Sequence, residues 1–112
     1  MKVFKHLNQL REMEKSAFPR ALSLVERDVC LLIGLYNERG ANVTQKVIRS
    51  CNVASQATLE RVLLRLVHEG IVHQSVSRSD GRCRELKLDT TIRRKLLHVK
   101  FNLMVNDSQL QR

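Results

Sequence analysis

The sequence predicts a mainly α-helical fold that carries one small β-hairpin, an α+β arrangement. Apolar residues recur at helical spacing along most of the chain, and after Gly70 the period changes from about 3.6 residues towards about two. A chain of 112 residues is long enough for one real core and too short for two ordinary domains. We therefore expect a single domain over residues 1–112.

Two helices are expected in the first third of the chain. The first, over residues 1–18, ends before Pro19, the only proline. Its apolar positions share helical spacing: Val3, Leu7, Leu10, Met13 and Ala17. The second begins at Ser23, because Ser23 and Glu26 have the spacing of a capping box, and it ends at Gly40.

The middle of the chain has the pattern of a helix-turn-helix. Thr44 is positioned to cap a short helix. The residues of this helix expected to point inward are Val47, Ile48 and Cys51. Asn52 follows where a tight turn needs a residue that tolerates positive φ, and Ser55 caps a longer helix that ends at Gly70.

Two strands are expected directly after this motif, over residues 71–76 and 85–88, with turn residues at Ser79–Gly81. A two-stranded hairpin that follows a helix-turn-helix is a wing. The sequence therefore predicts a winged helix-turn-helix core over residues 23–88 with flanking N- and C-terminal helices.

The C-terminal helix is expected to begin at Thr90 or Thr91 as its cap and to run to about residue 105, before a frayed tail over 106–112. It carries two apolar stripes, of which one can pack on its own chain and the other needs a second surface. We expect a homodimer built from the terminal helices. The residues expected at its interface are Phe4, Leu7, Leu10, Leu97, Phe101 and Met104.

The helix that begins after Ser55 has two faces of different chemistry. On a helical wheel, one side collects Leu59, Val62, Leu63, Leu66 and Val67. The opposite side collects Ala57, Arg61, Leu64, Arg65 and His68. The second side suits the major groove, where arginine bonds a guanine edge and a small apolar group touches a thymine methyl. The alternative is a solvated face on which Arg65 pairs with Glu69, and exposed Leu64 fits either a thymine methyl or a protein interface.

The hairpin tip concentrates cations, with Arg78, Arg82 and Arg84 flanking the turn. Arginine at such a tip can enter a narrow minor groove, and Asp80 can orient Arg82 through a bidentate pair. An ordinary solvated loop is the alternative.

Residues 54–72, ASQATLERVLLRLVHEGIV, resemble the recognition-helix signature of MarR-type (multiple-antibiotic-resistance regulator) winged-helix proteins, here in a short variant. The resemblance implies a prokaryotic transcription regulator that binds pseudo-palindromic DNA as a dimer. It also implies that Ser55, Gln56, Thr58 and Arg61 read the major groove, while Arg82, steadied by Asp80, reaches the minor groove. Ile48 stands where the family prefers a small residue, and Gln74 stands where arginine is common. The resemblance and the residue chemistry together predict the following DNA contacts: Thr44, Gln45, Ser55, Gln56, Ala57, Thr58, Arg61, Arg65, Arg78, Asp80, Arg82 and Arg84.

Composition narrows the classes of function. Twenty basic against eleven acidic residues give a net charge of +9, which favours a polyanionic partner such as double-stranded DNA. The sequence predicts neither a membrane span nor a secretion signal. It predicts a reducing, cytoplasmic setting, with the protein on the nucleoid. The three cysteines, Cys30, Cys51 and Cys83, form no zinc pattern; the first two are expected in the core, and Cys83 is the candidate for a reactive thiol. No catalytic motif, metal site or cofactor site is expected, and the sequence does not identify a small-molecule effector.

Two functions remain open at this level. The first is a sequence-specific, double-stranded DNA-binding transcription regulator. The second is a winged-helix protein-interaction module, such as an antirepressor or assembly factor, because winged helices serve both roles.

Overall fold

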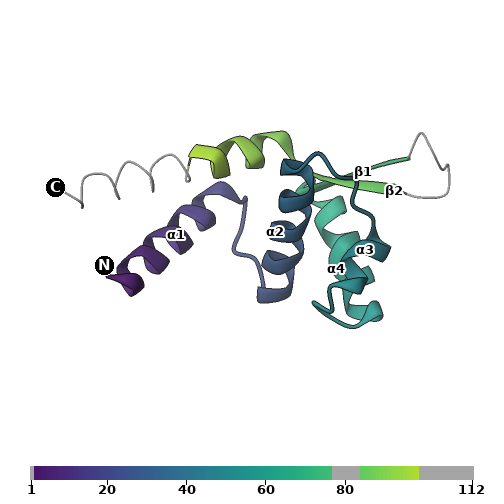
Figure 1. Ribbon diagram of the computed structural model, residues 1–112, viewed down its shortest axis with the longest axis horizontal. Coiled ribbons are helices and arrows are strands. Elements are labelled where there is room, and N and C mark those ends of the chain that lie inside the picture. Colours follow the sequence, from purple (N-terminus) through teal and green to yellow (C-terminus); the bar gives the residue numbers. More distant parts are fainter. Residues whose placement is uncertain (1, 77–83, 99–112) are drawn as a thin grey trace. The chain divides into compact units, whose positions relative to one another are not determined.

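The computed structural model describes residues 2–76 and 84–98. Six elements lie in order along the chain (Figure 1): α1 (Val3–Ala17), α2 (Leu24–Glu38), α3 (Gln45–Ser50), α4 (Gln56–His68), β1 (Val72–Val76) and β2 (Arg84–Leu88). Residues 90–98 are also helical. The predicted mainly α fold with a two-stranded hairpin is confirmed. The predicted residues Arg78, Asp80, Arg82, Cys83, Phe101 and Met104 lie outside the described ranges.

The chain divides into two compact units. One unit is Leu22–Asp89, whereas the sequence predicts a winged core with bounds at residues 23 and 88. The other combines Met1–Ala21 with Thr90–Arg112. The single domain over residues 1–112 stays a prediction.

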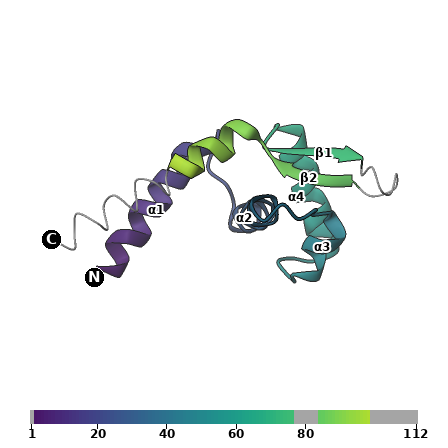
Figure 2. The ribbon, with the colours of Figure 1, turned by 45° about the horizontal axis from the view of Figure 1, so that its top comes forward.

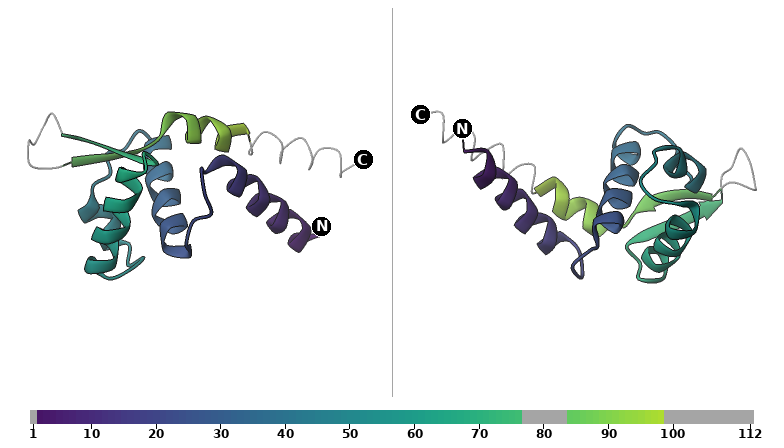
Figure 3. Two further views of the ribbon diagram at one scale, coloured as in Figure 1. Left: turned by 180° about the vertical axis from the view of Figure 1, so that it is seen from behind. Right: turned by 90° about the horizontal axis from the view of Figure 1, so that it is seen from below.

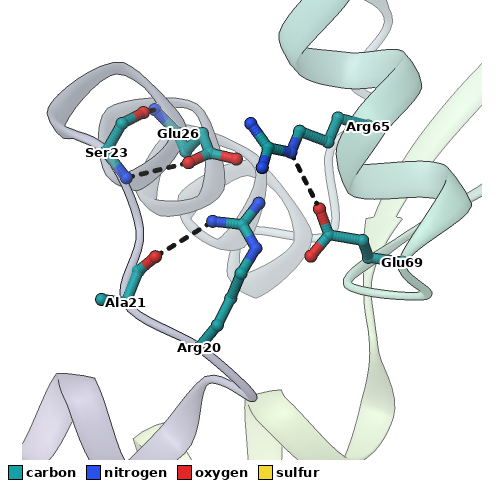
Figure 4. A network of polar contacts seen from close by, with 6 residues as sticks. All are labelled: Arg20, Ala21, Ser23, Glu26, Arg65 and Glu69. Atoms are coloured by element: carbon teal, nitrogen blue, oxygen red, sulfur yellow. Dashed lines mark hydrogen bonds and ion pairs between the residues drawn. The ribbon is translucent and has the colours of Figure 1, made fainter.

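Helix α2 begins and ends through local hydrogen bonds that the sequence predicts. The Glu26 carboxylate accepts from the Ser23 backbone N–H at 2.8 Å, and the Ser23 hydroxyl oxygen accepts from the Glu26 backbone N–H at 3.2 Å (Figure 4). These two bonds confirm the capping box. At the other end α2 stops at Glu38, and Gly40, two residues later, adopts φ +69°, a conformation that costs glycine little.

The helix-turn-helix is confirmed in its expected register (Figure 2). Thr44 caps α3 through a bond from the Val47 N–H, and Ser55 caps α4 through a bond from the Thr58 N–H. Asn52 has φ 56° in the turn between them. Asparagine tolerates this left-handed conformation better than most residues, which explains its place there.

Cys51 corrects one expectation. It is exposed rather than inward, and its thiol lies 3.5 Å from the Val47 carbonyl oxygen. Helix α3 ends at Ser50, so Cys51 is the C-cap residue. The helical spacing that carries Ile48 inward therefore no longer applies at position 51.

The wing, defined here as the hairpin β1–β2, is antiparallel, with register from Val72↔Leu88 to Val76↔Arg84. The observed strands differ from the predicted ones by one residue at their ends. On the other side of β2, the Leu86 N–H donates to the Val43 carbonyl at 2.8 Å. The segment that leads into α3 therefore continues the pairing beyond the wing.

The core of the Leu22–Asp89 unit is formed by apolar side chains from all its elements. Helix α2 contacts α3, α4 and β2, and α4 also contacts β1 (Figure 3). Ile48, a departure from the small residue of the MarR-type pattern, is fully buried. The fully buried side chains are Val29, Cys30, Ile33, Val43, Ile48, Leu59, Leu63, Leu66, Ile71, Val72 and Leu86.

Asn37, near the end of α2, joins this helix to the wing. Its side-chain amide donates to the Leu86 carbonyl at 3.2 Å, and its amide oxygen accepts from the Leu88 N–H at 3.0 Å. Both bonds are partly buried. Asn37 thus takes the place of a neighbouring strand for two backbone groups of β2.

In the terminal unit, Glu14 and Ala17 of α1 are buried, whereas Val3, Phe4 and Leu7 of the same helix are exposed. The helix over 90–98 corrects a second expectation, because it begins at Thr90 itself. Neither Thr90 nor Thr91 is then its cap, and the cap position falls on Asp89. Among the described helices, none is long and apolar enough to cross a membrane.

We predict that Asn37→Ala lowers the free energy of unfolding by about 1–3 kcal/mol, because it leaves two partly buried backbone groups of β2 without their partner. Chemical denaturation followed by circular dichroism measures this change. Asn8→Ala is the control, because the Asn8 amide makes a single exposed bond to the Phe4 carbonyl within α1. Equal stability of Asn37→Ala and the parent protein would contradict the role given to Asn37.

Candidate nucleic-acid interface

The two faces of α4 are separated as the sequence predicts. Leu59, Leu63 and Leu66 are buried, and Val62 and Val67 are half-buried at the edges of the apolar side. The residues expected to point outward are all exposed: Ala57, Arg61, Leu64, Arg65 and His68. The exposed face offers cations and small or branched apolar groups to a partner.

At the start of α4, the predicted contact residues bond to one another. The Ser55 hydroxyl accepts from the Thr58 N–H at 3.3 Å and lies 3.0 Å from the Thr58 hydroxyl. The Gln56 side-chain amide donates to the Glu60 carboxylate at 3.2 Å. These bonds fix the first turn of the helix and use part of its polar capacity within the chain.

The two arginines of α4 differ in their environment. Arg65 forms an ion pair with Glu69, with Arg65 Nε and Glu69 Oε1 3.2 Å apart (Figure 4). This is the pairing foreseen as the alternative to a DNA contact. Within residues 2–76 and 84–98, Arg61 makes no hydrogen bond or ion pair. Arg61 therefore presents an exposed guanidinium without a competing partner in the described part of the chain.

Helix α3 carries the other predicted contacts next to α4. Thr44 and Gln45 are half-buried, and the Thr44 hydroxyl oxygen accepts the capping bond from Val47 at 3.4 Å. Lys46 and Arg49 of the same helix are exposed and are not among the predicted contacts. The sequence pattern could have identified both as surface cations, because both fall outside the inward positions of this short helix.

In the wing, Arg84 is the one predicted cation that the described residues include. It begins β2, is exposed, and donates to the Gln74 side-chain oxygen at 3.3 Å. Gln74, which departs from the arginine common in MarR-type proteins, thus supplies an acceptor on the neighbouring strand. At the base of the wing, His73 Nε2 lies 2.8 Å from Asp89 Oδ1. This contact was not predicted, because the two residues are 16 positions apart.

The described residues hold no group of three or more histidine, cysteine, aspartate or glutamate side chains that suits a metal ion. Their buried side-chain polar atoms all have hydrogen-bond partners. The exposed face of α3 and α4 is suited to binding. It offers guanidinium, ammonium and hydroxyl donors beside apolar surface, and this combination suits phosphates and base edges.

The predicted dimer residues lie in the terminal unit. Phe4 is 79% exposed, Leu7 and Leu97 are also exposed, and Leu10 is half-buried. Large apolar side chains exposed on one amphipathic helix mark a surface that can be covered by another protein surface.

Solved structures with the same fold are known. A MepR–DNA complex from S. aureus matches with a TM-score of 0.67 at 14% sequence identity, over 97% of this chain and 86% of that chain. S. aureus MepR bound to ethidium bromide matches with a TM-score of 0.65 at 12% identity, over 97% and 77%. The heme sensor protein PefR, in complex with heme and carbon monoxide, matches with a TM-score of 0.60 at 15% identity, over 96% and 73%.

MepR and PefR are MarR-family winged-helix regulators, so the resemblance read from residues 54–72 is confirmed at the level of the fold. No protein-family model matches the sequence, and no curated protein matches it. At these identities the likeness is one of fold.

The exposure of the two described cysteines gives a prediction. In a Cys83→Ser background, we expect a water-soluble disulfide reagent to modify Cys51 rapidly and Cys30 only after unfolding, because Cys51 is exposed and Cys30 is 1% exposed. Titration of thiols with and without denaturant measures this difference. Cys51→Ser in the same background is the control and is expected to show no rapid phase. Two rapidly reacting thiols would contradict the assignment of Cys30 to the core.

Proposed function

We propose that this chain is a MarR-like transcription regulator that binds double-stranded DNA in a sequence-specific manner. In this proposal α4 enters the major groove, the wing reaches the minor groove, and a homodimer binds a pseudo-palindromic site. The observation that carries the proposal is the exposed face of α4, with unpaired Arg61 at its centre within the described residues, on a fold shared with a protein solved as a DNA complex.

The major-groove contacts follow from α4 and α3. Arg61 is suited to bond a guanine edge with two N–H groups. The phosphate backbone is attracted by the charges of Arg65, Lys46 and Arg49. To make such a contact, Arg65 gives up its ion pair with Glu69, which is exposed and therefore contributes little free energy. The proposed contacts of the helix starts are Thr44, Gln45, Ser55, Gln56, Ala57 and Thr58.

The minor-groove contact is proposed for the wing. Arg84 lies at its described end, and Arg78, Asp80 and Arg82 follow from the sequence alone. A minor groove narrowed by A·T base pairs has enhanced negative potential, which attracts arginine. The proposed partner is therefore duplex DNA with A·T pairs beside each half-site.

The homodimer is proposed through the terminal helices, on the exposed Phe4, Leu7 and Leu97 together with Leu10, Phe101 and Met104. Two copies related by a two-fold axis present two recognition helices to half-sites about one helical turn apart. We propose no catalytic activity and no cofactor. A regulator of this kind acts in the cytoplasm, on the nucleoid.

One observation favours a second candidate. Leu64 is 73% exposed on the outward face, next to Arg61, and an exposed leucine also suits a winged-helix protein-interaction module. Salt separates the two candidates, because phosphate contacts weaken steeply as salt rises and an apolar protein interface responds little.

We predict that Arg61→Ala changes the sequence enriched from random duplex DNA, whereas Arg65→Ala retains the same sequence with weaker binding. Both substitutions remove one positive charge from the same exposed face, so they are matched in the change of net charge, although Arg65 also loses its ion pair with Glu69. Loss of a bidentate guanine contact is expected to cost about 1–3 kcal/mol at that base pair. The measurement is selection from random duplex DNA near physiological salt, followed by titration of the enriched site.

Enrichment of an inverted repeat by the parent protein is the expected result. The absence of any enriched sequence would contradict the proposed function and favour the protein-interaction module. A sequence without two-fold symmetry would retain DNA recognition and contradict the dimer.

We also predict that Leu7→Lys weakens self-association, while Asn8→Lys leaves it unchanged. The two residues are adjacent and exposed on α1 and gain the same charge, but only Leu7 belongs to the apolar face. Loss of a buried leucine costs about 1.5–3 kcal/mol, so the dissociation constant of the dimer is expected to rise about tenfold or more. Sedimentation equilibrium measures it, and a parent protein that stays monomeric at tens of micromolar would contradict the proposed dimer.

A further inference from the structure

The outward face of α4 contains one large apolar side chain, Leu64, beside two arginines. Leu64 is 73% exposed, and its neighbours one turn away on either side are Arg61 and His68, with Arg65 next to it. An exposed leucine beside two arginines suits a partner that is both negatively charged and able to offer apolar groups. Duplex DNA offers both, through its phosphates and through the C5 methyl groups of thymine in the major groove.

The polar side chains of the same helix are largely committed within the chain. The Ser55 and Thr58 hydroxyls lie 3.0 Å apart, and Gln56 donates to Glu60. Arg65 is paired with Glu69. The side chains on this face that have no such bond to the described residues are Arg61, His68 and the apolar Ala57 and Leu64. Of these, Ala57, Arg61 and Leu64 lie in the first two and a half turns of α4 and offer one guanidinium between two apolar groups.

These three residues form one stripe along the helix. Ala57, Arg61 and Leu64 follow at intervals of four and three residues, which places them on the same side. The helix rises about 1.5 Å per residue, so Ala57 and Leu64 are about 10 Å apart along its axis, close to three base-pair steps of about 3.4 Å. The stripe therefore has the length of a short run of base pairs, with the cation between two apolar ends.

We infer that α4 reads thymine C5 methyl groups on both sides of a guanine, with Leu64 on one methyl group, Ala57 on the other and Arg61 on the guanine. This inference rests on the proposed function and specifies its substrate: a half-site in which thymines flank a guanine. Leu64 is the specificity-determining residue, because its larger side chain covers more of a methyl group than Ala57 does.

The experiment uses the full-length protein and the duplex selected by it. Each thymine of the half-site is replaced in turn by deoxyuridine, which lacks only the C5 methyl group. Binding is titrated for the parent protein, for Leu64→Ala and for Leu24→Ala. Leu24 is the matched control, because it is 71% exposed at the start of α2 and undergoes the same truncation. Circular dichroism confirms that the variants are folded.

We expect the parent protein and Leu24→Ala to bind the thymine duplex about fourfold more tightly than the deoxyuridine duplex at the position that Leu64 covers, the effect of burying about one methyl group. For Leu64→Ala, we expect this ratio to fall to about one. Sequence-specific binding by the parent protein with equal affinity for both duplexes would overturn the inference and leave the proposed regulator intact.

A selected half-site without a guanine between two thymines about three base-pair steps apart would also overturn the inference, as would a Leu64→Ala variant that keeps the parent ratio at every position. The absence of sequence-specific duplex binding by the parent protein would overturn the proposed function and this inference with it. The two failures are therefore distinguished by whether the parent protein selects a sequence at all.

Discussion

The position of the wing depends on the hydrogen bonds along one edge of β2. A two-stranded hairpin leaves the outer backbone groups of each strand unpaired, and a hairpin of this size is marginal in water by itself. Here the Asn37 amide bonds the Leu86 carbonyl and the Leu88 N–H, while the Val43 carbonyl accepts from the Leu86 N–H. The end of α2, the segment before α3 and the wing are thereby joined at one strand.

The packing of buried side chains then fixes the position of α4 against α2 and α3. Ile33 and Val29 of α2 and Ile48 of α3 are fully buried together with the apolar side of α4. The close approach of α2 and β2 occurs at Gly34, where an added Cβ would lie 3.6 Å from the Leu88 side chain. Because one side of α4 is held in the core, its opposite side has a defined orientation relative to the wing.

The same local bonds that stabilise α4 also limit what its surface can recognise. Caps and i,i+4 pairs engage Ser55, Gln56, Thr58 and Arg65. Such bonds make the helix rigid, and a rigid helix loses little entropy on binding. They also leave few polar side chains on this face without a partner among the described residues.

The sequence by itself determined the elements of this protein, because caps, turns and amphipathic faces depend on residues within a few positions of one another. The capping box of Ser23, the positive φ of Asn52 and the two faces of α4 follow from such local chemistry. Helical periodicity gave the wrong environment for Cys51, because α3 had already ended at Ser50. The cap predicted at Thr90 or Thr91 was also wrong, because the last described helix begins at Thr90 itself. Only the tertiary structure decided the bonds of Asn37 to β2 and the contact of His73 with Asp89. These pairs are 49, 51 and 16 residues apart, and partners at such distances are chosen by packing, which no local pattern records.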